Sequence, residues 1–210
     1  MIEIGARGIL ELHIISTQRQ SPDTIIQILE VIHPYLGFVH LREKSWSDYT
    51  MQGTIQTLLS RGVPRDKLIV NNRMELAQEM KTGGVHMPYR NRDALDIEST
   101  HLLRTGCSVH ALHEVKQVEE QGVDYLMYGH IFPSDSKKDV PPRGVKKLQA
   151  VVQSTSLPVI AIGGVTVENT AKVIATGAKG IAVLSGVLLA RDPLNEVQRY
   201  KNELDKQEDL

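Results

Sequence analysis

The sequence has little that would direct the protein to a membrane, a nucleic acid or an oxidising compartment. It holds one cysteine, Cys107, in 210 residues, which excludes an intramolecular disulfide and a cysteine metal cluster. Lysine and arginine total 24 against 25 acidic residues, and the net charge of −1 creates no overall attraction for polyanions. No run approaches the roughly 20 apolar residues of a membrane span, and the N-terminus MIEIGARGILELHII lacks the apolar core of a signal peptide. We therefore expect a cytoplasmic globular protein with no nucleic-acid or membrane partner.

Short apolar runs recur along the whole chain instead. Each is too short for a typical helix, and most are rich in Val and Ile, which favours strands buried on both faces. There are eight such runs: 10–16, 37–42, 67–72, 84–87, 104–110, 123–129, 157–164 and 179–185.

Segments with helical spacing separate these runs. Ser21 can cap and Pro22 can start one helix, and Thr166 can cap another that Gly177 closes. Further helices are expected at 47–61, 73–81, 112–121, 144–153 and 193–206, and the segment 94–103 could hold a helical turn or two. The alternation predicts a (β/α)₈ TIM barrel in a single domain over residues 1–210, with a doubly wound open sheet as the alternative.

Polar residues gather where the predicted strands end. In a TIM barrel these ends meet at the rim that carries the chemistry, so we expect the side chains to surround one mouth. The candidates for substrate binding are Arg42, Lys44, Asn71, Ser108, Ser134, Ser136, Lys137, Gly163, Gly164, Ser185 and Gly186.

Two glycine pairs and one basic pair have specific interpretations. Gly163-Gly164 and Ser185-Gly186 follow the last two strands, where backbone N–H groups can hold a phosphate; they could also simply permit tight turns. Arg42 and Lys44 lie two residues apart and could clamp a carboxylate or phosphate. A salt bridge of this pair with Glu43, or a solvated loop, is the alternative.

His130 is the candidate acid–base group, because it follows a strand-ending glycine and precedes the polar loop YGHIFPSDSKK. A structural role for it is equally compatible with its position. His110 is a second candidate, whereas His40 and His86 lie on predicted strands and could be hydrogen-bonded core. The sequence contains no serine-nucleophile elbow, no phosphate-binding P-loop and no recognised metal-ligand spacing.

Seven segments together resemble the thiamin phosphate synthase superfamily over almost the whole chain. They are HLREK (40–44), IVNNR (69–73), GVHM (84–87), GCSVH (106–110), GHIFPSDSKK (129–138), PVIAIGG (158–164) and GIAVLSG (180–186). The resemblance implies the barrel fold and a part in thiamin synthesis.

The chain departs from this family at its metal site. In the synthases two aspartates hold the magnesium that bridges a pyrimidine diphosphate, and here Asn72 and Asn91 occupy those places. A neutral amide is a poor ligand for a hard divalent cation, although Asp93 lies nearby. We therefore expect no metal and no cofactor.

A histidine at position 130 resembles the TenI-type branch, the thiazole tautomerases. The resemblance implies a cofactor-free isomerisation of a phosphorylated carboxythiazole precursor to its aromatic form, with His130 moving the proton. The alternatives are a thiamin phosphate synthase and a non-catalytic protein that binds thiazole phosphate. The sequence does not determine the oligomeric state, and it is compatible with a homodimer.

Overall fold

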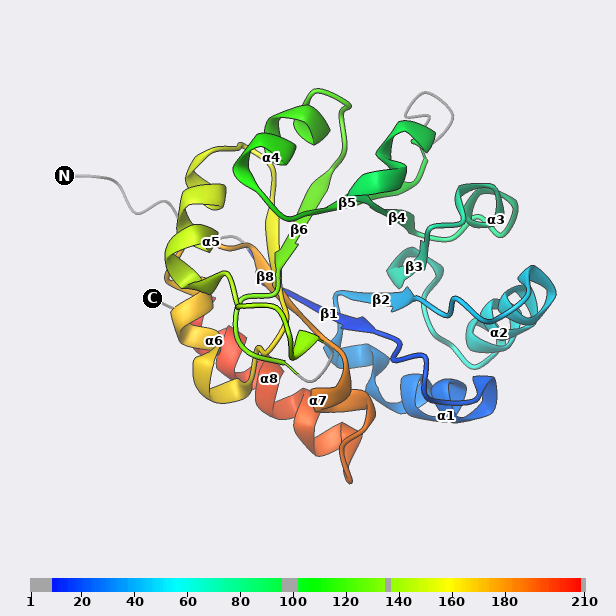
Figure 1. Ribbon diagram of the computed structural model, residues 1–210. Coiled ribbons are helices and arrows are strands. Elements are labelled where there is room, and N and C mark those ends of the chain that lie inside the picture. Colours follow the sequence, from blue (N-terminus) through cyan, green and yellow to red (C-terminus); the bar gives the residue numbers. More distant parts are fainter. Residues whose placement is uncertain (1–8, 96–101, 135–136, 209–210) are drawn as a thin grey trace.

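The computed structural model describes residues 9–95, 102–134 and 137–208. Eight parallel strands pair in chain order, and β1 closes the ring on β8 through the register Glu11↔Gly180 (Figure 1). This closure confirms the TIM barrel and excludes the open sheet. The strands are β1 Glu11–Ile15, β2 Phe38–Leu41, β3 Leu68–Asn71, β4 Gly84–Pro88, β5 Arg104–Val109, β6 Tyr125–Gly129, β7 Val159–Ile162 and β8 Gly180–Val183.

The helices lie outside the ring (Figure 1). They are α1 Pro22–Ile32, α2 Asp48–Ser60, α3 Met74–Glu79, α4 Leu112–Glu119, α5 Gly144–Gln153, α6 Val167–Ile174, α7 Ser185–Leu188 and α8 Pro193–Glu208, with short 3₁₀ helices at His33–Tyr35, Arg65–Lys67 and Tyr89–Ala94.

The helix starts follow from local side chains. Ser21 accepts a hydrogen bond from the Thr24 N–H at 3.3 Å, and Pro22 occupies the first helical position, as expected. Thr166 and Asn169 form a capping box in which the Thr166 N–H donates to the Asn169 side chain at 2.9 Å. These caps set the direction in which the chain leaves β7.

Two apolar layers hold the barrel. The outer layer packs the strands against the helices through side chains such as Leu41, Ile55 and Leu148, all at 0% exposure. The inner layer is a smaller cluster built by Ile15, Ile69, Tyr125, Met127, Ile160 and Ala182. Burying one such large side chain stabilises the fold by about 1.5–3 kcal/mol.

The structure differs from expectation in two segments. Strand β8 ends at Val183, so Ser185 and Gly186 open the short helix α7 instead of ending a strand. The expected helical turns within 94–103 lie largely outside the described residues, apart from Ala94 at the end of a 3₁₀ helix and residues from 102 onward. Among the described residues, no helix is both long and apolar enough to cross a membrane.

Candidate active site

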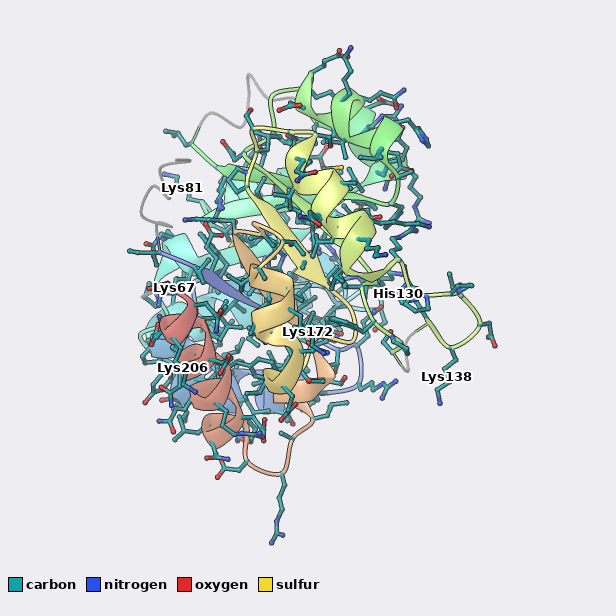
Figure 2. All side chains as sticks on the ribbon, turned by 90° about the vertical axis from the view of Figure 1, so that its left-hand side faces the viewer. Lys67, Lys81, His130, Lys138, Lys172 and Lys206 are labelled. Carbon is teal, nitrogen blue, oxygen red and sulfur yellow. The ribbon has the colours of Figure 1, made fainter. Side chains whose placement is uncertain are left out.

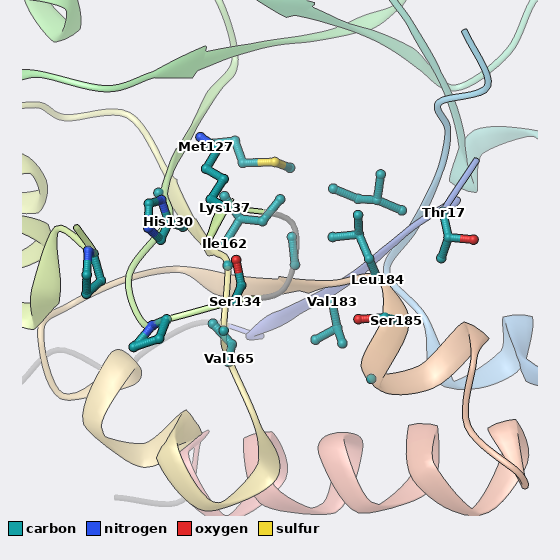
Figure 3. A pocket seen from close by; sticks show the side chains of 18 of the residues that line it. Thr17, Met127, His130, Ser134, Lys137, Ile162, Val165, Val183, Leu184 and Ser185 are labelled. Atoms are coloured by element: carbon teal, nitrogen blue, oxygen red, sulfur yellow. The ribbon is translucent and has the colours of Figure 1, made fainter. Parts of the chain in front are cut away.

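A cavity of about 1400 Å³ opens where the strands' C-terminal ends meet their loops (Figure 3). Figure 2 shows His130 and Lys138 at one end of the molecule, with Lys67 and Lys81 toward the other. The cavity brings together many of the residues expected at one mouth: Arg42, Ser108, His110, His130, Ser134, Lys137, Gly163, Gly164, Ser185 and Gly186. Ser136 lies outside the described residues.

The turn after β7 needs its glycines. Gly163 and Gly164 have φ values of +95° and +67°, which L side chains rarely adopt. A Cβ on Gly163 would lie 2.3 Å from the Cβ of His130, and one on Gly164 would lie 2.4 Å from the Pro133 carbonyl oxygen. The bare backbone therefore lets the β6 loop approach β7 closely at the cavity wall.

A second recess, of about 330 Å³, lies beside the main cavity and carries positive charge. Arg42, Pro88 and Ser108 line both spaces, so the two share a wall. Lys44, Arg73 and Arg90 also line the recess, as expected for Lys44, and Glu43 is the one acidic residue among its lining residues, so positive charge is in excess.

Two contacts bear on whether Arg42 is available to bind an anion or pairs with Glu43. The buried Glu43 carboxylate accepts a hydrogen bond from the Gln18 N–H at 3.0 Å and so faces the loop after β1. Arg73 pairs with Asp48 and donates to the Glu43 carbonyl oxygen at 3.1 Å, which fixes the chain after β2. This arrangement favours the clamp over a pairing with Glu43.

The donor set of this recess does not fit magnesium. Asn72 lines it, and the Asn91 amide, from the 3₁₀ helix that follows β4, donates to Asn72 Oδ1 at 2.6 Å. Asp93 turns away, with its carboxylate 3.6 Å from Arg92 Nε and 3.4 Å from Gln121 Nε2. Over the described ranges no three His, Cys, Asp or Glu side chains form a metal-binding group. Two paired amides beside several cations suit an anion better than a hard cation.

His130 is buried at 3% exposure and lies on the wall of the main cavity. Its Nε2 lies 3.1 Å from the Val140 carbonyl oxygen, which can only accept, so Nε2 carries the proton of that bond. Nδ1 has no hydrogen-bond partner among the described residues. The Arg143 N–H donates to the His130 carbonyl oxygen at 3.0 Å. His130 thus ties both ends of the loop that carries Lys137.

The other candidate for proton transfer, His110, lies across the same cavity. Burial, and then the nearby Lys137 charge, lower the pKa of His110, which keeps its ring neutral near neutral pH. Cys107 is buried in β5, and burial raises the pKa of its thiol to about 12, so it offers no thiolate nucleophile.

The interior of the barrel holds a hydrogen-bonded chain that the sequence did not reveal. His13 Nε2 lies 2.8 Å from Glu11 Oε2, His13 Nδ1 lies 2.9 Å from His40 Nε2, and His40 Nδ1 lies 3.2 Å from Asn71 Oδ1. His40 was expected to be hydrogen-bonded core, and it is. The alternation of Glu11, His13 and Ile15 on β1 is the signal that could have placed His13 inside.

Comparisons with known proteins identify the relatives of this chain. The family model described as "Thiamine monophosphate synthase" matches residues 12–187. A thiamine-phosphate synthase of Pyrococcus abyssi is 31% identical over 90% of this chain and 92% of its own, and one of Caldivirga maquilingensis is 37% identical over 71% and 77%. A solved thiamine phosphate pyrophosphorylase from Pyrococcus furiosus superposes with a TM-score of 0.79 at 27% identity, covering 96% of this chain and 98% of its own.

These relatives confirm the superfamily resemblance and correct the expected activity. The sequence favoured a thiazole tautomerase because a histidine stands at position 130 and asparagines stand where the synthases carry their metal ligands. The curated relatives at 31–37% identity are named thiamine-phosphate synthase, so the tautomerase assignment is wrong and the synthase alternative is the better one. A single histidine at the mouth was too weak a basis, because the buried ring is equally suited to holding a loop.

Proposed function

The chain belongs to the thiamine monophosphate synthase family, and on this basis we propose that it is a transferase of thiamin synthesis. Its two substrates are a phosphorylated thiazole and a pyrimidine diphosphate. The lone pair of the thiazole ring nitrogen attacks the pyrimidine's diphosphate-bearing carbon, so a C–N bond forms while the C–O bond breaks and its electron pair leaves with the diphosphate.

The observation that supports this proposal most is that the cavity and the cationic recess share a wall. One anion site lies at Gly163, Gly164, Ser185 and Gly186, and the second lies in the recess, with Arg42 between them. A transferase needs both substrates side by side, since holding them together removes most of the entropic cost of their encounter.

The recess supplies charge for the leaving group. Arg42, Lys44 and Arg90 bring positive charge to a space where Asn72, bound by the neighbouring Asn91, offers an amide in place of a carboxylate. Fixed cations stabilise the negative charge that develops on a departing diphosphate. We therefore assign the diphosphate to this recess without a bound magnesium ion.

In this proposal Lys137 binds substrate, His130 holds the loop that carries Lys137, and neither residue moves a proton. The displacement itself needs no proton transfer, and His130 Nε2 is committed to Val140. Lys137 lines the cavity on the loop that His130 anchors, so it can contact the thiazole phosphate. Ser134 lies on the same loop (Figure 3).

Steady-state kinetics with both substrates varied tests the two sites. Arg42→Gln should raise the KM of both substrates, because Arg42 lines both spaces. Ser185→Asp should raise only the KM of the thiazole phosphate, and Arg90→Gln only that of the pyrimidine diphosphate. If Ser185→Asp and Arg90→Gln affect the same substrate, the two-site arrangement is wrong.

A further inference from the structure

The buried chain of Glu11, His13, His40 and Asn71 runs from the opposite rim of the barrel to the recess. Glu11 and Arg104 begin β1 and β5, and the Arg104 guanidinium donates to Glu11 Oε1 at 3.0 Å. His13 and His40 are fully buried, at 0% exposure. Asn71 ends β3 and lines the recess.

The proton count along this chain decides how Asn71 is oriented. Burial raises the pKa of Glu11, but the His13 hydrogen bond and then the Arg104 charge outweigh it and hold the pKa below its usual value, so the carboxylate can only accept. His13 must then carry a proton on Nε2. If His13 is neutral, its Nδ1 accepts from His40 Nε2–H, and His40 Nδ1 must accept as well. The Asn71 NH₂ then donates to His40, and the Asn71 oxygen faces away from the chain.

One added proton reverses these roles. With His13 or His40 protonated, His40 Nδ1–H donates to Asn71 Oδ1, the atom that lies 3.2 Å away. The Asn71 NH₂ then faces the recess. The two amide orientations share the same heavy-atom positions, so the proton count chooses between them.

We infer that the His13–His40 pair is a positioning device whose protonation sets whether Asn71 offers the recess a hydrogen-bond donor or an acceptor. An anion in the recess needs the donor, so its binding takes up a proton in the barrel core. The coupling to anion binding rests on the proposed diphosphate site. The order of hydrogen bonds from Glu11 through the two histidines to Asn71 does not.

In the protein without ligand, the surroundings of His13 and His40 disfavour an added proton on either ring. Burial lowers the pKa of both rings, more strongly for His40, and only the Glu11 carboxylate offsets this for His13. The groups that face the two rings come from every strand packed against them: Glu11 on β1, Phe38 on β2, Asn71 on β3, His86 on β4, Arg104 on β5 and Tyr125 on β6. An anion that binds Asn71 raises the pKa of the pair, so affinity is greatest at low pH and falls as pH rises through the pKa of the bound state.

Long-range ¹H–¹⁵N NMR of histidine-labelled protein at pH 7.5 reads the ring nitrogens directly. Without ligand, both rings should be neutral and protonated on Nε2. Inorganic pyrophosphate should convert one ring of the pair to imidazolium. Pyrophosphate that binds without changing either ring overturns the coupling, and pyrophosphate that does not bind overturns both the coupling and the diphosphate recess.

Glu11→Gln tests the hydrogen-bond order independently of any ligand. The glutamine amide can donate to His13 Nε2, which moves the His13 proton to Nδ1 and the His40 proton to Nδ1 without an added charge. Both rings should therefore reverse their tautomer, with and without pyrophosphate. Glu30→Gln, which removes a carboxylate from the exposed pair with Arg61, is the control and should leave both rings unchanged. Unchanged tautomers in Glu11→Gln overturn the positioning role whatever pyrophosphate does.

Discussion

At the scale of single residues, His130 has the position of an acid–base group but makes hydrogen bonds that suit a structural role. It stands at the end of β6 on the cavity wall, where an acid–base group would stand. Its ring is nevertheless bound to the Val140 carbonyl oxygen at 3.1 Å, and its backbone accepts from Arg143 at 3.0 Å. These bonds hold the start of the loop of Lys137 to its end, and they support our proposal that His130 stabilises the proposed phosphate site instead of moving a proton.

Substitution of His130 tests this role. His130→Ala leaves the Val140 oxygen without its donor, and a lost buried hydrogen bond of about 1 kcal/mol corresponds to roughly a fivefold change. We expect the KM of the thiazole phosphate to rise by about that factor, with a smaller change in kcat. His130→Gln keeps an N–H donor and should recover part of the loss. A kcat that falls by about 10²-fold or more at unchanged KM would instead indicate proton transfer.

Gly163 is the residue whose replacement should disturb the site most. Its φ of +95° and the 2.3 Å approach to the His130 Cβ leave no room for a side chain. Gly163→Ala should lower the unfolding free energy by about 1–3 kcal/mol through strain, and it should weaken phosphate binding.

Gly53 in α2 is the matched control, because a Cβ there meets nothing within 4 Å. Gly53→Ala should stabilise the protein by about 0.5–1 kcal/mol, since alanine favours the helix. Urea unfolding measures both variants. Equal stability of Gly163→Ala and the parent protein would contradict the close contact between β7 and the β6 loop.

At the scale of elements, the ends of β3 and β4 carry paired amides in place of carboxylates. Asn72 has a φ of +59°, a conformation that asparagine and aspartate both tolerate better than most residues. Asn72→Asp combined with Asn91→Asp should therefore keep the backbone and create a divalent-cation site. Titration with Mn²⁺ by electron paramagnetic resonance should show one bound ion in the double variant and none in the parent. Tight binding of Mn²⁺ to the parent protein would contradict the anion assignment of this recess.

The elements themselves were predictable, and several contacts between them were not. Runs of β-branched residues located all eight strands, because a strand buried on both faces leaves a local mark. Ser21 and Thr166 marked helix starts for the same local reason. The bond between His13 and His40 joins residues 27 positions apart in the barrel interior, and no local pattern encodes such a partner. The role of His130 depended likewise on a contact ten positions away, with Val140.

At the scale of the whole molecule, the polar interior makes stability depend on pH. Burial lowers the pKa of His13, His40 and His86, the last to about 3, from an ordinary value of 6.5. The unfolded chain therefore binds more protons below pH 6.5. The stability from these rings is fully present above that pH and is lost as pH falls toward the folded-state pKa values.

Urea unfolding between pH 7.5 and 5.0 tests this dependence. The unfolding free energy should fall by up to about 1.4 kcal/mol per pH unit for each such histidine, or about 4 for all three. His86→Gln should reduce that slope by about a third. A pH-independent free energy over this range would mean that the rings bind protons equally in the folded and unfolded states, which would contradict the effect of burial.

The central claim is that the two anion sites hold two substrates that react with each other. ³¹P NMR of the protein with the thiazole phosphate and the pyrimidine diphosphate, in the presence of EDTA, measures this directly. The account predicts release of diphosphate together with one equivalent of thiamine phosphate, because Arg42, Lys44 and Arg90 supply the charge that faces the leaving group. Release that requires magnesium would contradict that source of charge. Unchanged spectra of both substrates, with EDTA and with magnesium alike, would contradict the transferase itself.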